Sequence, residues 1–249
     1  MIQTESRSSI TILRLNRSVS NPINGEMVDA LEAAIHAAAA DPAVAGVVLS
    51  TTSEKFFSIG LDIPDLFPLS REEFGRFIRN FDRLCLTLLA IPKPTVAAVR
   101  GHAVAGGCVL ALCCDYRIIG SGKKLMGLNE AKLGVPVPYP AHQALVHAVG
   151  PNVARRMIDS ASFYSPDELL RFGLVDQIAE DGDAEDAAAS RATQLAEIPG
   201  CAYRAIKADR IGPMVDEVAA RLEEKERVFL DCWYSPPTQE NLRAAMAKF

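Results

Sequence analysis

Hydrophobic and polar residues follow patterns along the chain that predict several short strands. Apolar and polar residues alternate over residues 9–15, as in a half-buried strand. The apolar run at residues 44–50, which contains GVVLS, suits a strand that is buried on both faces. The segments PTVAAV (94–99) and DYRII (115–119) predict two more strands.

Helical periodicity appears between these strands. Residues 27–40 and 105–113 are predicted to be helices. Residues 71–91 carry apolar side chains at helical spacing with charged residues on the opposite side, and the prolines that follow end this helix. Because strands and helices alternate, the sequence predicts an α/β fold with parallel strands.

The pattern changes towards the C-terminus. Ser165 and Glu168 predict a capped helix that ends near Gly173, and LVDQI follows as a strand. Beyond Asp181 only helices are predicted. We therefore expect a core at residues 1–180 and a C-terminal helical region at residues 181–249. Helices of this kind can pack on a neighbouring subunit or on their own chain, and the sequence leaves both alternatives open.

Composition and charge narrow the function classes. The chain has 249 residues, 49% of them hydrophobic, with 26 Lys and Arg against 31 Asp and Glu, a net charge of −5. This balance is typical of a folded protein and argues against general binding of nucleic acid or anionic membranes. No secretory signal or long apolar run is visible, and the six cysteines lack CxxC spacing, so we expect a cytosolic protein with reduced thiols.

Paired glycines mark one candidate site. Gly106 and Gly107 open a predicted helix, where backbone N–H groups can face an anion or a developing oxyanion. The turn at residues 57–60 could aim a second N–H group at the same place. The alternative interpretations are tight packing for the glycines and an ordinary turn at the edge of the core.

Glu130 is the candidate catalytic carboxylate. It lies between the apolar residues Leu128 and Leu133 in a stretch of low charge density. Burial there would raise its pKa towards the range that suits a general base. The alternative is a surface glutamate paired with Lys132 or Lys124.

Three segments together resemble the crotonase (enoyl-CoA hydratase/isomerase) superfamily. They are FSIGLDI, AVRGHAVAGGCVLALCCDYRI and MGLNEAKLGV, in this order, and the resemblance covers residues 10–178. It implies a spiral of ββα turns followed by a helical region, assembled as a homotrimer or a dimer of trimers. It also implies an acyl-CoA thioester as substrate, with coenzyme A as part of the substrate and no separate cofactor or metal.

The resemblance also implies roles for particular residues. The backbone N–H groups of Ile59 and Gly106 would bind the thioester oxygen as it becomes an enolate. Hydratases of this superfamily have two glutamates, and here Val109 takes the place of one while Glu130 is the other. A lone glutamate resembles the mitochondrial-type Δ3,Δ2-enoyl-CoA isomerases. We therefore expect an isomerase. A hydratase, another acyl-CoA activity or a non-catalytic binding subunit remain alternatives.

Further contacts with the acyl-CoA are expected around these residues. Lys55 is a candidate for the coenzyme A phosphates, with Arg14, Arg17 and Lys207 as further candidates. Tyr139 and Phe163 would either line an acyl pocket or pack in the core. The remaining expected substrate contacts are Gly60, Leu61, Asp62, Ile63, Gly107 and Asn129, of which Asp62 could instead cap a helix.

Overall fold

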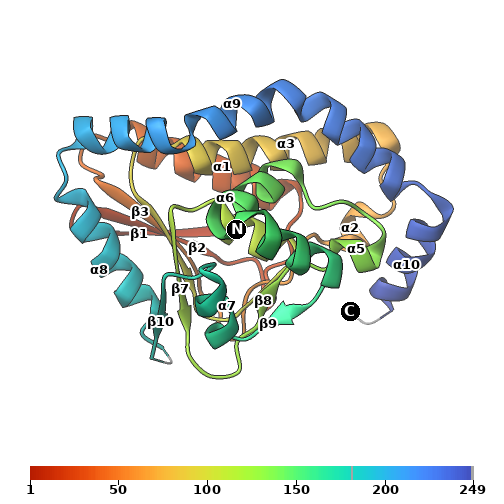
Figure 1. The fold of residues 1–249 in the computed structure, drawn as a ribbon, viewed down its shortest axis with the longest axis horizontal. Coiled ribbons are helices and arrows are strands. Elements are labelled where there is room, and N and C mark those ends of the chain that lie inside the picture. The colour runs from red at the N-terminus through yellow and green to blue at the C-terminus, as the bar shows by residue number, and fades with distance from the viewer. Residues whose placement is uncertain (181, 248–249) are drawn as a thin grey trace.

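The computed structural model describes residues 1–180 and 182–247 and has the predicted α/β architecture, built on a large twisted sheet (Figure 1). The order of its strands is β1-β2-β3-β5-β7-β10. β1 pairs antiparallel with β2, and the other neighbours are parallel. The strands are β1 (Ile2–Arg7), β2 (Ile10–Leu15), β3 (Gly46–Thr51), β5 (Thr95–Val99), β7 (Tyr116–Gly120) and β10 (Gln177–Ala179).

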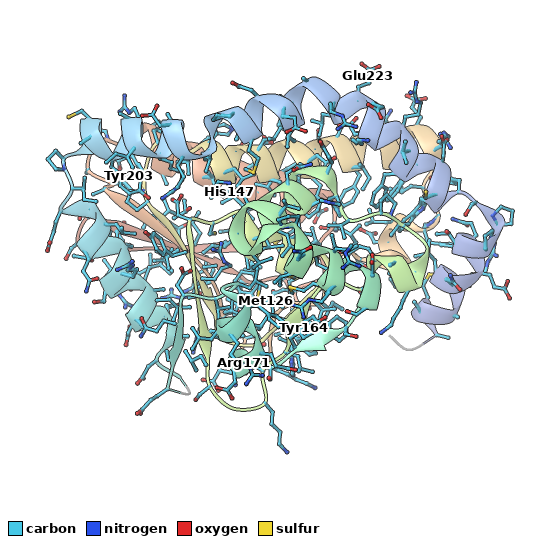
Figure 2. All side chains as sticks on the ribbon, viewed as in Figure 1. Met126, His147, Tyr164, Arg171, Tyr203 and Glu223 are labelled. Atoms are coloured by element: carbon cyan, nitrogen blue, oxygen red, sulfur yellow. The ribbon has the colours of Figure 1, made fainter. Side chains whose placement is uncertain are left out.

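A second, smaller sheet has the strand order β4-β6-β8-β9. Its strands are β4 (Phe56–Ser58), β6 (His102–Val104), β8 (Met126–Gly127) and β9 (Phe163–Tyr164). Met126 of β8 pairs with Tyr164 of β9, and Figure 2 labels both. The chain passes from β3 to β4, from β5 to β6 and from β7 to β8, so each turn adds one strand to each sheet. This is the repeated ββα spiral that the sequence resemblance implies, and the prediction is confirmed.

Helices cover both faces of the large sheet. One face packs against α1 and α3, and the other packs against alanines of α8. A parallel sheet needs this cover because both of its faces are apolar. The helices are α1 (Gly25–Ala40), α2 (Ile63–Leu66), α3 (Arg71–Ala90), α4 (Gly106–Leu112), α5 (Glu130–Leu133), α6 (Tyr139–Ser160), α7 (Pro166–Phe172), α8 (Ala184–Ala196), α9 (Gly200–Trp233) and α10 (Pro236–Met246).

The C-terminal helices pack on their own chain. α9 lies along α3, where the ring of Trp233 stacks on that of Phe74 with centroids 4.1 Å apart. α10 then reaches α2 and α5 (Figure 1). The helical region begins where its composition predicts, but the boundary next to Asp181 falls outside the described residues. The division at residue 180 stays a prediction. No helix of the described chain is long and apolar enough to span a membrane.

Candidate active site

The three glycine- and glutamate-bearing segments meet at a cavity of about 570 Å³. Ile59 and Leu61 line it from the turn after β4, Gly106 from the start of α4, and Asn129 and Glu130 from the start of α5. Residues that are far apart in the sequence therefore come together because consecutive turns of the spiral place the ends of β4, β6 and β8 side by side.

Glycines allow the first two segments to approach each other. Gly60 has a φ of +95°, and a Cβ atom there would lie 2.9 Å from the amide nitrogen of Gly106. A Cβ atom on Gly107 would lie 2.4 Å from the carbonyl oxygen of Ser58. Side chains at these positions would push the segments apart. Gly60 and Gly107 do not line the cavity; they shape its wall.

The expectation that the backbone N–H group of Ile59 faces the substrate is wrong. The N–H group of Ile59 donates to the carbonyl oxygen of Ser20 at 3.0 Å, so it is not available to a substrate. The amides of Leu61 and Gly106 have no acceptor within the described residues. They also lie close together, since a Cβ atom on Gly106 would be 3.3 Å from the nitrogen of Leu61. The free pair of donors therefore includes Leu61 in place of Ile59.

A buried network of hydrogen bonds fixes the turn that follows β4. The hydroxyl of Ser58 donates to the carbonyl of Asn21 at 2.7 Å and accepts from the amide of Gly60 at 3.1 Å. The side chain of Asn21 donates to Thr51 at 2.8 Å. Sequence reasoning missed Asn21, whose positive φ of 45° is unusual for a residue other than glycine.

Glu130 is almost completely buried, with 6% of its surface exposed. Its Oε2 atom has no hydrogen-bond partner among the described residues. Burial raises the pKa of Glu130 to about 7, although the backbone amides of Asn129 and Glu130 itself partly oppose this rise. The expected alternative of an exposed surface glutamate is wrong. A carboxyl group with a pKa near neutrality can both accept and return a proton.

Of two other residues that bear on the choice of reaction, Asn129 lines the cavity with Glu130 and Val109 does not. Asn129 lines the cavity, and its Oδ1 atom is buried without a partner in the described chain. Val109 is completely buried within α4 and is not on the cavity wall. A second carboxylate is therefore absent from the position where the family resemblance would place it in a hydratase.

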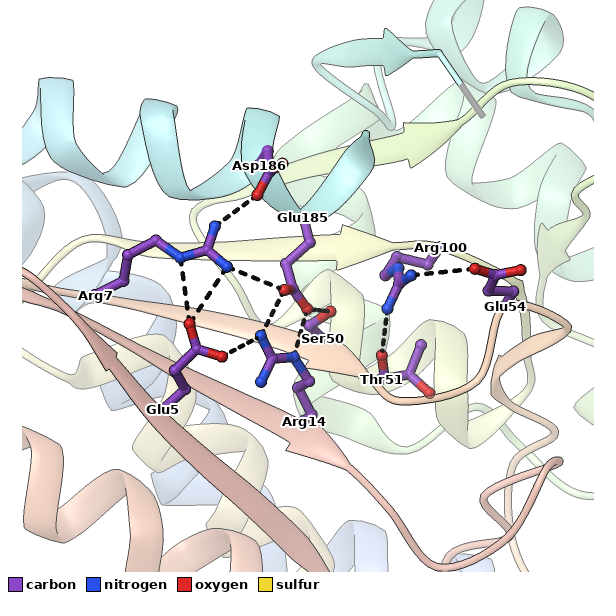
Figure 3. A network of polar contacts seen from close by, with 9 residues as sticks. All are labelled: Glu5, Arg7, Arg14, Ser50, Thr51, Glu54, Arg100, Glu185 and Asp186. Atoms are coloured by element: carbon purple, nitrogen blue, oxygen red, sulfur yellow. Dashed lines mark hydrogen bonds and ion pairs between the residues drawn. The ribbon is translucent and has the colours of Figure 1, made fainter. Parts of the chain in front are cut away.

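Three of the four cations considered for the coenzyme A phosphates are held elsewhere. Arg14 is clamped by Glu185, with its Nε and Nη2 atoms 2.8 and 2.7 Å from the two carboxylate oxygens (Figure 3). Lys207 is buried and donates to Asp115 at 2.7 Å. The expectations for Arg14 and Lys207 are therefore wrong.

Of the other two cations, Arg17 is paired with Asp62, whereas Lys55 lines the cavity. Arg17 donates to Asp62 at 2.5 Å, and Asp62 also accepts from the amide of Asp65 as the cap of α2. Asp62 therefore has the alternative role of capping and does not line the cavity. Lys55 does line it, with its Nζ atom 5.5 Å from the centre of the Phe56 ring.

Aromatic and aliphatic side chains from distant helices form another part of the wall. Phe81 of α3, Phe229 and Trp233 of α9 and Ala245 of α10 contribute to it. Phe163 and Ile63 also line the cavity, whereas the hydroxyl of Tyr139 donates to Glu217. The sequence could not assign the α9 and α10 residues to the site, because helical periodicity indicates a buried face but not its partner.

Comparisons with known proteins identify the family of the chain. Residues 5–249 match the family model described as enoyl-CoA hydratase/isomerase. The mouse mitochondrial enoyl-CoA delta isomerase 1 is 28% identical over 200 residues, covering 80% of this chain and 69% of that protein. A crotonyl-CoA hydratase of Syntrophomonas wolfei is 29% identical over 248 residues, covering 98% of this chain and 94% of that protein.

Solved structures extend the likeness to the fold. The crystal structure of human mitochondrial delta3-delta2-enoyl-CoA isomerase has a TM-score of 0.94 and 24% identity, covering 99% of this chain and 97% of that chain. This likeness shows that the two proteins share the same spiral fold. The chain belongs to the enoyl-CoA hydratase/isomerase family.

Proposed function

We propose that the protein moves the double bond of a 3-enoyl-CoA to give the 2-trans-enoyl-CoA. The observation that carries this proposal is that Glu130 is the one carboxylate among the cavity-lining residues in the described chain. One carboxylate is sufficient for isomerisation, because the proton taken from one carbon is returned to another. Activating a water molecule with the help of a second carboxylate would need a partner that Val109 does not provide.

The proposed mechanism uses the carboxyl group of Glu130 and two backbone N–H groups of the cavity wall. Glu130, as the carboxylate, removes a proton from C2 of the 3-enoyl-CoA. The electrons of that C–H bond move into a dienolate whose negative charge lies on the thioester oxygen. The N–H groups of Leu61 and Gly106 donate to this oxygen. The protonated Glu130 then gives its proton to C4 as the double bond forms between C2 and C3.

The expected contributions of these groups are large. A general base contributes about 10²–10⁴ in rate. A preorganised oxyanion donor contributes about 10²–10³. Both effects are greater where little water screens the charges, and the burial of Glu130, which is 6% exposed, supports such an environment. We assign Lys55 to the phosphates of coenzyme A, because it is the cavity-lining cation in the described chain.

Hydration of a 2-enoyl-CoA is the second candidate. It is favoured by Asn129, whose unpartnered Oδ1 atom beside Glu130 offers an acceptor to a water molecule. It also agrees with the hydratase name of the relative from Syntrophomonas wolfei. A non-catalytic acyl-CoA-binding role is less well supported, since it gives no use to the buried carboxyl group of Glu130.

Product identification with a panel of enoyl-CoA thioesters separates these candidates. We expect 3-enoyl-CoA substrates to give 2-trans-enoyl-CoA, with little 3-hydroxyacyl-CoA formed from 2-enoyl-CoA. A 3-hydroxyacyl-CoA as the main product would support hydration instead, and binding without turnover would support the non-catalytic role. Assembly as a homotrimer or dimer of trimers and a cytosolic location remain predictions, which light scattering and cell fractionation would test.

A further inference from the structure

The short helix that carries Glu130 cannot hold itself in place. α5 has four residues, and the preceding Asn129 makes no side-chain capping hydrogen bond. A single helical turn is not stable in water by itself, because too few hydrogen bonds offset the cost of ordering it. Contacts from elsewhere in the fold must therefore hold this turn, and with it the backbone that carries the Glu130 side chain.

α10 provides such contacts from more than 100 residues further along the chain. The hydroxyl of Thr238 donates to the carbonyl oxygen of Gly134 at 3.0 Å. The side-chain amide of Asn241 donates to the carbonyl oxygen of Leu133 at 3.3 Å. These carbonyls lie at the C-terminal end of α5, where a helix leaves its acceptors without partners.

The side chain of Thr238 is buried, and hydrogen bonds hold it in this position. It is only 2% exposed, and its oxygen accepts a hydrogen bond from the hydroxyl of Ser235 at 3.0 Å, which leaves its own proton for Gly134. The fit is tight, because a Cβ atom on Gly134 would lie 2.5 Å from the Thr238 Oγ1 atom. Gly134 in turn donates its N–H group to the carbonyl of Glu130 at 3.0 Å. A continuous chain of hydrogen bonds thus joins Thr238 to the backbone of Glu130.

α10 is itself firmly seated at the cavity. Leu242 is completely buried, and Ala245 forms part of the cavity wall. Gln239 donates to the backbone carbonyl of Trp233 at 2.9 Å and so ties α10 to the end of α9. Figure 1 shows α5 beside α10 at one end of the molecule.

We infer that Thr238 is a positioning residue that, assisted by Asn241, fixes the direction of the Glu130 carboxylate through the backbone of α5. The inference rests on the proposed function, in which Glu130 transfers the proton. A displacement of the reacting group by about 1 Å can lower the rate by about 10²-fold. Loss of the Thr238 hydroxyl therefore acts on the chemical step more than on substrate binding.

Steady-state kinetics on four variants of the full chain test this inference. Thr238→Val removes the hydroxyl and keeps the shape of the side chain, and Thr238→Ser restores the hydroxyl. Thr193→Val is the matched control, because Thr193 makes a similar hydroxyl-to-carbonyl bond within α8, away from the cavity. Glu130→Gln in the same assay reports separately on the proposed function. Each variant is assayed with 3-enoyl-CoA for kcat and KM after its folding has been checked by circular dichroism.

We expect Thr238→Val to lower kcat about 10- to 100-fold with KM changed less than about threefold. Thr238→Ser should recover most of the lost kcat, and Thr193→Val should match the wild type. If Glu130→Gln is inactive but Thr238→Val keeps the kcat of the wild type, the inference fails and the proposed function stands. An equal loss in Thr238→Ser and Thr238→Val would also overturn the inference, since packing would then explain the loss.

Should Thr238→Val fail to fold, Asn241→Ala at an exposed position replaces it, and an unchanged kcat in that variant overturns the inference. Retention of activity in Glu130→Gln overturns the proposed function, and the positioning inference fails with it.

Discussion

A Cβ atom placed on Gly60 would lie 2.9 Å from the amide nitrogen of Gly106, so these two residues meet at a distance that only glycine at position 60 permits. The approach brings the free N–H groups of Leu61 and Gly106 to the same side of the cavity. A backbone feature of two loops thus creates the proposed site for the thioester oxygen.

Gly60→Ala should therefore affect both stability and catalysis. The new methyl group would lie too close to backbone atoms, and a φ of +95° is strained for alanine. We expect these two effects to lower the free energy of unfolding by about 1–3 kcal/mol. Displacement of the two donors should lower kcat about 100-fold. Gly122→Ala is the control, because Gly122 has a φ of +81° but open space around its Cα. Urea denaturation and initial rates are measured, and a Gly60→Ala variant with the kcat of the wild type would contradict the site.

Glu185→Gln should destabilise the fold without changing the chemistry. Glu185 accepts two hydrogen bonds from Arg14 and one from Ser50 beneath α8 (Figure 3). Loss of its charge leaves Arg14 with the half-exposed Glu5 as its one ionic partner among the described residues, and we expect the free energy of unfolding to fall by about 3 kcal/mol. Asp186→Asn, which removes an exposed partner of Arg7, should cost less than about 1 kcal/mol. Equal losses of stability in the two variants would contradict a stabilising role for the buried ion pair between Arg14 and Glu185.

Lys55→Ala tests the proposed contact with the coenzyme A phosphates. An exposed charge contributes modestly, so KM for the CoA thioester should rise about two- to fivefold while kcat changes little. The effect should shrink at high salt and vanish with a pantetheine thioester that lacks the phosphates. Arg76→Ala, which changes an exposed cation of α3, is the control. An equal rise in KM for the pantetheine thioester would contradict this assignment.

The buried carboxyl of Glu130 should make stability depend on pH in a defined direction. Burial raises the pKa of Glu130 from its ordinary value of 4.5 to about 7. Between these pH values the folded protein holds a proton that the unfolded chain has lost, so the contribution of Glu130 to stability falls as pH rises through this window. The pKa difference corresponds to up to about 3 kcal/mol.

Glu130→Gln removes this dependence. We expect the stability of the variant relative to wild type to increase between pH 4.5 and pH 8, because the other titrating groups cancel in the comparison. Urea denaturation at several pH values measures the difference. A difference that does not vary with pH would contradict the raised pKa of Glu130.

Local signals in the sequence predict much of the fold. The apolar spacing in residues 71–91 predicts α3, whose N-terminus is capped by Ser70 and Glu73, and Ser165 with Glu168 predicts α7. The apolar neighbours of Glu130 suggest burial but leave a surface position open, and the structure shows that the side chain is buried. In each of these cases the information lies within a few residues of the feature.

Errors arise where a distant partner decides the outcome. The sequence does not reveal that the carbonyl of Ser20 occupies the amide of Ile59, or that Glu185 holds Arg14 from 171 residues away. The short strands β6 and β8 are also hard to predict, because they have only three and two residues and depend on their neighbours in the second sheet. Local patterns in the sequence also fail to predict the contact between α5 and α10.

The central claim, that one carboxylate moves the proton, is tested most directly by the rate at which Glu130→Gln converts 3-enoyl-CoA to 2-trans-enoyl-CoA. The amide keeps the size of the side chain but cannot accept the C2 proton. We predict that kcat falls by about 10²–10⁴ while the variant stays folded and still binds the acyl-CoA. Isomerisation at a rate close to that of the wild type would contradict the account.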